Sequence, residues 1–336
     1  MFDKVNKEQE KLYKAMASTH FQTAETATDK FAKALEEPLR REIFDCDNVG
    51  PFNIFEAADF RNSRCVTYDL DPVKPGTANN YTAYAIPDCA CLPCVMMEGD
   101  YVTVPTYMIG NCVEWCIKRM RDANFNMMDR AVEAFQAGFT KKLNMDAWHV
   151  VLAAGLDRNI IVSDSNATAP GQFTKRLVTL MKTTQRRNGG GNAQCNGRAG
   201  ITDLFISPEA NDDIYNWNLD QVDEVTRREI FTSSDCDRGL RNLFCVDLHI
   251  LDELGQNQEY QLYYENILGG ALPPNKIELV VGLDLTRRDS FVAPVRQELE
   301  VFSDMTMHKC MKEGVYGWME VGFAVLSSLR VLLGAI

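Results

Sequence analysis

The densest group of chemically active side chains is a cysteine cluster in "PDCACLPC", residues 87–94. Cys91 and Cys94 have the spacing of one zinc-binding pair, and Cys89 lies two residues before them. A structural zinc ion needs four ligands, usually two cysteine pairs or one pair with two histidines. The three thiols are therefore weak metal-site candidates, because a site would need a second pair from elsewhere in the chain.

The second pair would have to be Cys112 and Cys116, whose spacing suits consecutive turns of a helix. The four histidines stand alone, at His20, His149, His249 and His308. A redox Cys-x-x-Cys motif normally opens a helix, whereas this one lies in a proline-broken strand region. The eleven cysteines are scattered, and the charged N-terminus is no secretory signal. We therefore expect free thiols, no cofactor and no disulfide framework.

Catalytic patterns are weak elsewhere in the sequence. Asp247 and His249 share one face of a predicted strand with Cys245, but neighbouring strand residues often do so. The "RRNGGGN" loop lacks the Lys-Ser/Thr of a phosphate-binding loop, which leaves Arg186 and Arg187 as candidates for contact with a partner. No Gly-x-Ser-x-Gly, HExxH or EF-hand pattern occurs. The sequence predicts a protein that is not an enzyme.

Composition limits the classes of partner. The 336 residues carry a net charge of −12, which disfavours binding of a nucleic-acid backbone over the whole surface. The apolar C-terminal tail, residues 314–336, is interrupted by Glu320, Arg330 and a serine pair. These interruptions leave no uncharged run long enough to cross a bilayer. We expect buried strands there and no membrane contact.

The pattern of the first hundred residues predicts extensions that have too few apolar residues to form a hydrophobic core by themselves. Residues 1–44 have helical spacing with a thin apolar stripe, which predicts an extended arm that Pro38 breaks. Residues 51–108 contain six prolines and short alternating stretches around the polar segment "PVKPGTANNYTAY". This composition predicts a long hairpin that projects from the body of the protein.

The rest of the chain reads as a body that these extensions join. Residues 111–145 predict a long amphipathic helix, followed by a short helix at 144–156. Residues 157–295 alternate helix and strand, and in "ITDLFISPE" a strand leads to Ser207, a good helix N-cap before Pro208. Residues 296–336 return to strand patterns in "RQELEVFSDMTM", "WMEVGFAVL" and "RVLLGAI".

This order of parts resembles the major capsid proteins of tailed bacteriophages with the Hong Kong 97-type fold. The stretches that carry the resemblance are "DYVTVPTYMI", "TDLFISPEANDDIYNW", "VDEVTRREIF", "DLTRRDSFVAPVRQELEV" and the C-terminal "GVYGWMEVGFAVLSSLRVLLGAI". The resemblance implies an α+β fold with five parts. They are an N-terminal arm (1–50), an extended-loop or E-loop hairpin (51–108), a peripheral domain with a long spine helix (109–157), an α/β axial domain (158–295), and closing strands of both domains (296–336).

The resemblance also implies a role. Such subunits assemble with themselves into hexamers and pentamers that tile an icosahedral shell around double-stranded DNA, without sequence-specific binding. The virion is then the expected location, after synthesis in a host bacterial cytoplasm. Scaffolding, portal and decoration proteins are further partners in this class. The candidate inter-subunit contacts are Arg40, Arg41, Lys74, Tyr81, Tyr84, Arg186 and Arg187.

Two points of the resemblance stay open at this level. Some members crosslink through a lysine of the extended loop, and Lys74 lies in that region, but nothing in the sequence shows that it reacts. Two alternative functions also remain. One is an encapsulin-like compartment shell with the same fold, and the other is a cytosolic zinc or thiol protein centred on Cys89, Cys91 and Cys94.

Overall fold

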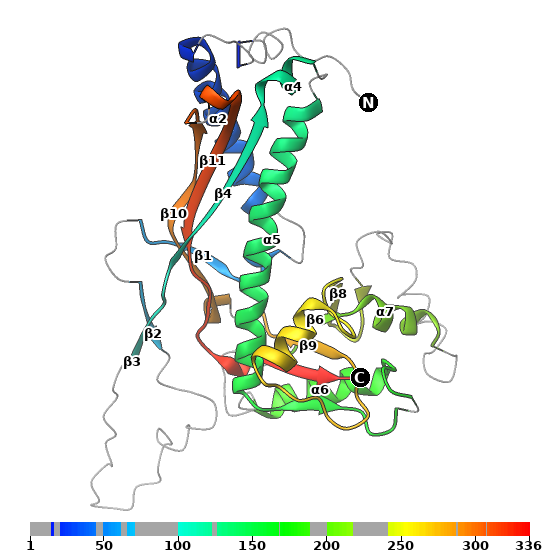
Figure 1. Cartoon of the computed structure of the whole chain (residues 1–336). Coiled ribbons are helices and arrows are strands. Elements are labelled where there is room, and N and C mark those ends of the chain that lie inside the picture. The colour runs from blue at the N-terminus through cyan, green and yellow to red at the C-terminus, as the bar shows by residue number, and fades with distance from the viewer. Residues whose placement is uncertain are drawn as a thin grey trace, which may run out of the picture.

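The protein is described here from a computed structural model, which places two β-sheets along one long helix (Figure 1). The structure describes residues 15–16, 21–44, 50–61, 66–70, 100–122, 126–167, 169–188, 200–217, 241–286, 288–306 and 308–336. A five-stranded sheet lies beside the N-terminal part of the long helix, and a six-stranded sheet lies at its C-terminal end. A two-stranded ribbon belongs to neither sheet and packs on the five-stranded one near Val292.

The long helix is α5 (Asn126–Asp157), which has 32 residues. At 1.5 Å per residue it spans about 48 Å, far more than an average globular helix. Phe135, Phe139 and Leu143 are buried at four-residue steps, and Trp148 continues the apolar face toward the second sheet. The two helices predicted at 111–145 and 144–156 are therefore wrong in their bounds, since a single helix runs from 126 to 157.

Residues 107–116 form a strand, β4 (Tyr107–Cys116), and a short helix α4 (Ile117–Asp122) follows. The predicted helical start at 111 rested on apolar residues four positions apart, such as Val113 and Ile117. A spacing of four fits a strand period of two as well as a helix period of 3.6. Ile109 and Trp115 are buried on one side of β4 while Met108 and Glu114 are exposed on the other, which is strand alternation.

The five-stranded sheet has the order β1-β10-β11-β4, with β12 (Ala324–Val325) beside β10. β1 (Glu56–Asp59) runs parallel to β10 (Phe291–Asp304), and the other neighbours are antiparallel. β11 (Lys312–Val321) pairs with β4 along its whole length, from Lys312 opposite Cys116 to Val321 opposite Tyr107. These long ladders make one rigid surface, and α5 and the N-terminal helix pack on it.

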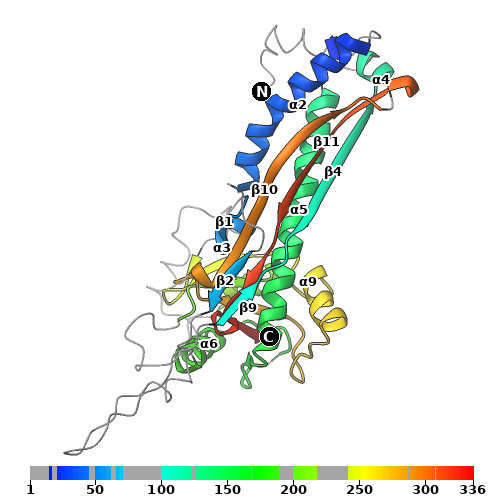
Figure 2. The ribbon, with the colours of Figure 1, turned by 90° about the vertical axis from the view of Figure 1, so that its left-hand side faces the viewer.

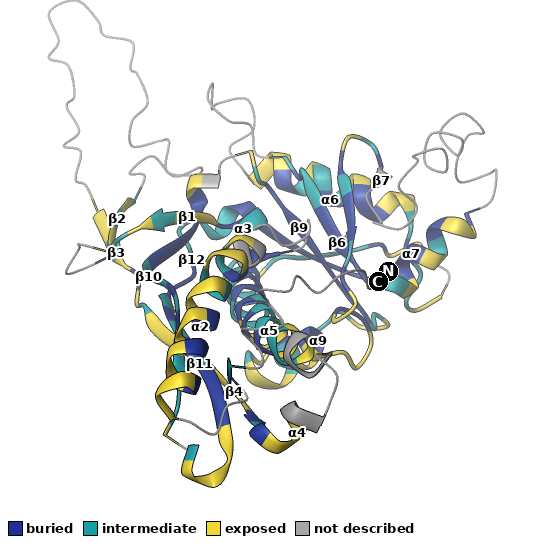
Figure 3. Cartoon of the chain, turned by 90° about the horizontal axis from the view of Figure 1, so that it is seen from above, coloured by how far each residue is buried: buried dark blue, intermediate teal, exposed yellow. Residues whose placement is uncertain are grey.

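The N-terminal helix is α2 (Phe21–Phe44), and it continues through Pro38. The predicted break at Pro38 is therefore wrong. Proline removes one helical hydrogen bond, but packing on the sheet holds the next turn, where Leu39 is buried and Arg40 bonds the Leu299 carbonyl. Exposed and buried residues alternate along α2, as expected for a helix with one side on the sheet (Figure 3). The short helix α3 (Pro51–Ile54) then leads into β1.

The six-stranded sheet has the order β5-β13-β9-β6-β8-β7. Its strands are β5 (Ile161–Ser163), β13 (Val331–Ala335), β9 (Leu279–Leu283), β6 (Asp203–Ile206), β8 (Asp247–Ile250) and β7 (Arg241–Asn242). β9 and β13 are buried along their whole length, because helices cover both faces of this sheet. The closing segment 296–336 contributes strands to both sheets, which ties them together.

Two successive residues of β9 point to opposite faces of the sheet and show which helices cover each face. Val280 packs in a cluster with Leu177 of α6 (Lys175–Asn188) and Ala210 of α7 (Pro208–Tyr215). Val281 packs in the other cluster, which holds Trp148 of α5 together with Tyr260 of α9 (Glu259–Leu262). The helices α6 and α9 thus lie on opposite faces of the sheet, and Figure 2 shows the same arrangement.

The sequence pattern that predicts a helix start is clearest at the beginning of α7. The Ser207 side chain accepts a hydrogen bond from the Ala210 amide at 3.1 Å, and Pro208 occupies the first turn. This confirms the predicted N-cap. The predicted strand at 244–250 instead begins at Asp247, because Phe244 and Cys245 have φ of 54° and 60° and form a turn. Among the described helices, none has the length and apolarity to cross a membrane.

Candidate functional site: assembly surfaces

The suspected polar group on β8 is a packing arrangement. His249 is buried, its Nε2 atom lies 2.8 Å from Asp203 Oδ1, and its ring stacks on Phe205 at 4.8 Å. Cys245 lies in the preceding turn, so the alternation that put it on one face with Asp247 does not reach it. His249 therefore helps to join β8 to β6, and Cys245 lies before the strand whose face it was predicted to share.

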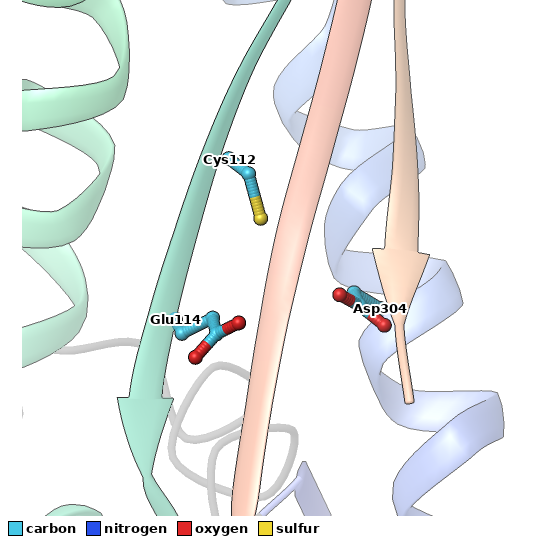
Figure 4. Close-up of side chains that lie close together, drawn as sticks. All are labelled: Cys112, Glu114 and Asp304. Atoms are coloured by element: carbon cyan, nitrogen blue, oxygen red, sulfur yellow. The ribbon is translucent and has the colours of Figure 1, made fainter. Parts of the chain in front are cut away.

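The described residues contain one group with metal-ligand chemistry, Cys112 and Glu114 on β4 with Asp304 at the end of β10 (Figure 4). Their ligand atoms lie within 4.8 Å of one another. Burial, followed by the charges of Asp304 and Glu114, raises the pKa of the Cys112 thiol and so disfavours the thiolate that binds metals. The Lys312 side chain also donates a hydrogen bond to the Glu114 carboxylate at 3.2 Å. We assign no metal to this group.

Within the residues that the structure describes, no second pair of zinc ligands joins the predicted cysteine cluster. Cys112 and Cys116 lie on the strand β4 and not on consecutive helical turns, so that part of the prediction is wrong. The cluster Cys89, Cys91 and Cys94 lies outside the described residues, as do the extended-loop candidates Lys74, Tyr81 and Tyr84. Around them, β2 (Thr67–Leu70) and β3 (Asp100–Thr103) pair antiparallel, with Leu70 opposite Asp100, and form the base of a hairpin.

The arm helix α2 is bound to its own subunit. Its buried face includes Ala24, Ala27 and Phe31, and the Phe31 ring lies 6.5 Å from that of Trp115 in an edge-on contact. Arg40 donates from Nε to the Leu299 carbonyl at 2.7 Å, and its Nη1 lies 2.9 Å from Glu298. Of the two arginines predicted to contact a neighbour, Arg40 therefore holds the arm in place.

Arg41, by contrast, is exposed, and among the described residues its one ion pair is with Glu37 at 3.6 Å on the same helix. Arg186 and Arg187 are also exposed, in the last turn of α6. An exposed pair within one helix contributes little stability. These three side chains are consequently available to a partner, while their role as inter-subunit contacts stays a prediction.

A buried polar pair lies near the start of α2. Glu313 is buried, its Oε1 atom lies 3.1 Å from His308 Nδ1, and the His308 ring meets Phe21 of α2 edge-on at 5.3 Å. Burial raises the pKa of Glu313, and the hydrogen bond with His308 offsets part of that rise. Within the part of the chain that is described, the Oε2 atom of Glu313 has no hydrogen-bond partner.

The outward face of the five-stranded sheet carries aromatic side chains that sequence reasoning missed. Phe302, Tyr316 and Trp318 form a cluster with centroid distances of 5.5, 5.2 and 5.4 Å. On the adjacent strand β4, Met108 is 61% exposed. The signal was present in "VYGWMEV", where apolar residues occupy both strand parities instead of one. Apolar residues at both parities are typical of a strand whose two faces are both buried by neighbouring elements or chains.

No family model matches the chain, and no curated protein matches its sequence. Solved structures match its fold. The capsid asymmetric unit of cyanophage Pam1 matches with a TM-score of 0.61 at 12% identity, over 89% of this chain and 92% of that one. The capsid of a native GTA particle gives 0.54 at 12% identity, over 86% and 90% of the two chains. Mycobacterium phage Bobi gives 0.54 at 11% identity, over 85% and 88%.

These likenesses extend along nearly the whole of each chain, although few residues are identical. Along this chain the described elements follow the order helix α2, ribbon β2–β3, long helix α5 with its sheet, and a lobe of sheet and helices. The chain therefore has the Hong Kong 97-type fold of phage capsid proteins.

Proposed function

We propose that this chain is the structural major capsid protein of a phage, which self-assembles into the hexamers and pentamers of an icosahedral head around double-stranded DNA. The observation that carries the proposal is the fold shared with the Pam1 capsid protein over 89% of this chain. Fold alone does not determine function, so the surfaces of the subunit must support the same reading.

Those surfaces suit a subunit that is completed by its neighbours. The aromatic cluster Phe302, Tyr316 and Trp318 lies on a sheet face with exposed apolar area, such as Phe302 at 37% and Met108 at 61%. Contiguous exposed apolar patches on a folded chain mark interaction sites. In an assembled shell, a neighbouring copy would cover this face and remove its apolar surface from water.

The proposed contacts follow from the same reasoning. Lys74, Tyr81 and Tyr84, which follow β2 in the sequence, are proposed to contact a neighbour, with Cys89, Cys91 and Cys94 as small packing side chains in that contact. Arg41 of the arm and Arg186 and Arg187 of the axial lobe are exposed charges for further contacts. Function in this proposal is mechanical and not enzymatic, and the subunit resides in the virion, with scaffolding, portal and decoration proteins as additional partners.

Expression of the full chain, followed by size-exclusion chromatography and negative-stain microscopy, tests the proposal. We expect capsomers or closed shells of uniform diameter. A chain that stays monomeric under varied salt, pH and crowding would contradict it. Shells that form around protein cargo, encoded beside no terminase or portal, would instead favour the encapsulin-like alternative.

A further inference from the structure

Two segments of the axial lobe, the six-stranded sheet with its helices, carry opposite charge, while α7 adds the acidic residues Glu209, Asp212 and Asp213 on the same face of the sheet as α6. Residues 165–202 contain no acidic side chain and six basic ones, in a chain whose net charge is −12. The basic residues are Lys175, Arg176, Lys182, Arg186, Arg187 and Arg198. Residues 242–275 show the opposite pattern, with five acidic residues and neither lysine nor arginine. The acidic residues are Asp247, Asp252, Glu253, Glu259 and Glu265.

The basic stretch includes α6, and Arg176, Arg186 and Arg187 lie on the exposed side of that helix, while Lys182 donates to the Phe244 carbonyl. Leu177, Val178 and Met181 are buried against the sheet. The exposed side carries Arg176, Thr179, Thr183, Arg186 and Arg187. Arg176 is held at 3.7 Å from Asp164. Arg186 and Arg187 make no ion pair with any residue that the structure describes, so their charges face outward.

The acidic stretch builds the loop before α9, α9 itself, and the π-helical turn Tyr263–Ile267. Asp252, Glu253 and Glu259 are exposed, and across the described ranges none of them forms an ion pair. The same segment exposes Ile267 to 71% and Leu262 to 40%. This segment thus exposes apolar side chains together with carboxylates, a mixture that occurs on surfaces that bind protein partners.

The two surfaces lie on opposite faces of one sheet. Val280 of β9 points into the α6 cluster, and its neighbour Val281 points into the cluster with Tyr260 of α9. Figure 2 shows α6 and α9 on opposite sides of the lobe. A molecule with complementary surfaces on opposite faces cannot pair them within itself. It can pair them head to tail with copies of itself, and such heterologous contacts form rings when the rotation between successive copies closes.

We propose that the α6 face of one axial lobe docks on the α9 face of the next copy, with Arg186 and Arg187 against Glu253, Glu259 and Asp252. This contact would be repeated around each capsomer, and it rests on the proposed self-assembly. Charge complementarity of this kind sets the partner and the orientation of docking. A second copy is favoured over a nucleic acid as the occupant, because the rest of the chain is acidic and repels phosphates.

Charge reversal with compensation tests the contact. R186E/R187E makes both faces acidic, and E253K/E259K makes both faces basic. We expect each double variant to remain folded but to need an assembly concentration about tenfold above that of the unaltered chain, an order-of-magnitude value for lost and repulsive exposed pairs. The quadruple variant R186E/R187E/E253K/E259K, which carries both reversals in one chain, should restore assembly.

Mixing provides a sharper readout. The R186E/R187E and E253K/E259K chains should assemble together, with the two chains alternating around a ring. Alternation is compatible with a hexamer and not with a pentamer, so the mixture should give six-membered rings and fail to close shells. The matched control R130E/K141E changes the net charge equally on the exposed side of α5 and should leave the axial contact intact.

The outcomes separate this contact from the proposed function. Shells from the unaltered chain together with normal shells from R186E/R187E would overturn the contact and leave the capsid role standing. Failure of the quadruple variant to recover assembly would also overturn the proposed contact. If R186E/R187E assembles normally but loses binding to a fluorescent DNA duplex, α6 is a polyanion surface instead. A chain that never assembles removes both proposals.

Discussion

At Glu313, burial opposes ionisation of the carboxyl group. Its carboxyl is buried beside His308, and burial raises its pKa above the usual 4.5. A raised carboxyl pKa means that the folded state holds the proton more tightly than the unfolded state. The stability that this proton contributes is complete below about pH 4.5 and is lost as the pH rises through the folded-state pKa.

The first prediction concerns the variant Glu313→Gln, which removes that titration while keeping the shape of the side chain. The melting temperature of the unassembled chain should fall, relative to that of the variant, as the pH rises from 4 to 8. Thermal melts at matched ionic strength across this range measure the difference. Parallel pH profiles for the two proteins would show that Glu313 titrates normally.

The second prediction concerns the cysteines at 89, 91 and 94. If they are free thiols, the purified chain should contain far less than one zinc per subunit by elemental analysis, before and after treatment with a chelator. Serine substitution of Cys89, Cys91 and Cys94 should then leave the metal content unchanged. Near-stoichiometric zinc that disappears with these substitutions would restore the zinc-protein alternative.

At the scale of elements, the arm helix α2 offers a matched pair of neighbouring arginines. Arg40 bonds the Leu299 carbonyl at 2.7 Å and Glu298 at 2.9 Å, whereas Arg41 is exposed. The third prediction is that Arg40→Met costs about 1–3 kcal/mol of stability, because it removes charge-assisted hydrogen bonds at a half-buried position. Arg41→Met should change stability by less than about 0.5 kcal/mol.

Urea unfolding followed by tryptophan fluorescence measures both variants, and limited proteolysis within residues 21–44 reports whether the arm stays docked. Equal effects of the two substitutions would contradict the assignment of Arg40 as the residue that holds the arm. The comparison is sharp because the two side chains are chemically identical and adjacent, and differ only in what the fold places around them.

The fourth prediction separates the two faces of β11. Trp318 lies on the outward aromatic face, and Met319 is fully buried on the inward one. Trp318→Ser should leave the unassembled chain folded with a small change in melting temperature, but should impair assembly. Met319→Ala should cost about 2–5 kcal/mol of folding stability through the cavity that it leaves. If Trp318→Ser assembles like the unaltered chain, the aromatic face is not a contact.

The elements differ in how far sequence alone could place them. The start of α7 was predictable because Ser207, Pro208 and the acidic first turn act within a few residues. The start of α5 was not, because apolar residues four apart satisfy both the helical and the strand period. The continuation of α2 through Pro38 depends on Leu39 and Arg40 meeting β10, a contact between residues about 260 positions apart that no local pattern contains.

The outward aromatic face was missed for a related reason. Its residues come from β10 and β11, and only the sheet register brings Phe302 opposite Tyr316 and beside Trp318. The opposite charge of the 165–202 and 242–275 stretches can be read from sequence, but their placement on opposite faces of one sheet cannot. The hairpin candidates Lys74, Tyr81 and Tyr84 lie outside the described residues and stay predictions.

At the scale of the whole molecule, the order of parts in the sequence carried more information than any single motif. An arm, a hairpin, a long helix and an α/β lobe occur in that order in the fold, which solved phage capsids share at 11–12% identity. An acidic chain with both apolar and oppositely charged surfaces is suited to contact copies of itself.

The most direct test of this account is electron microscopy of the purified, assembled chain at a resolution that traces secondary structure. We predict a closed shell of pentamers and hexamers, with the six-stranded lobes around each capsomer axis and the outward face of β10 and β11 covered by a neighbour. A homogeneous monomer with no capsomers under any assembly condition would contradict the central claim.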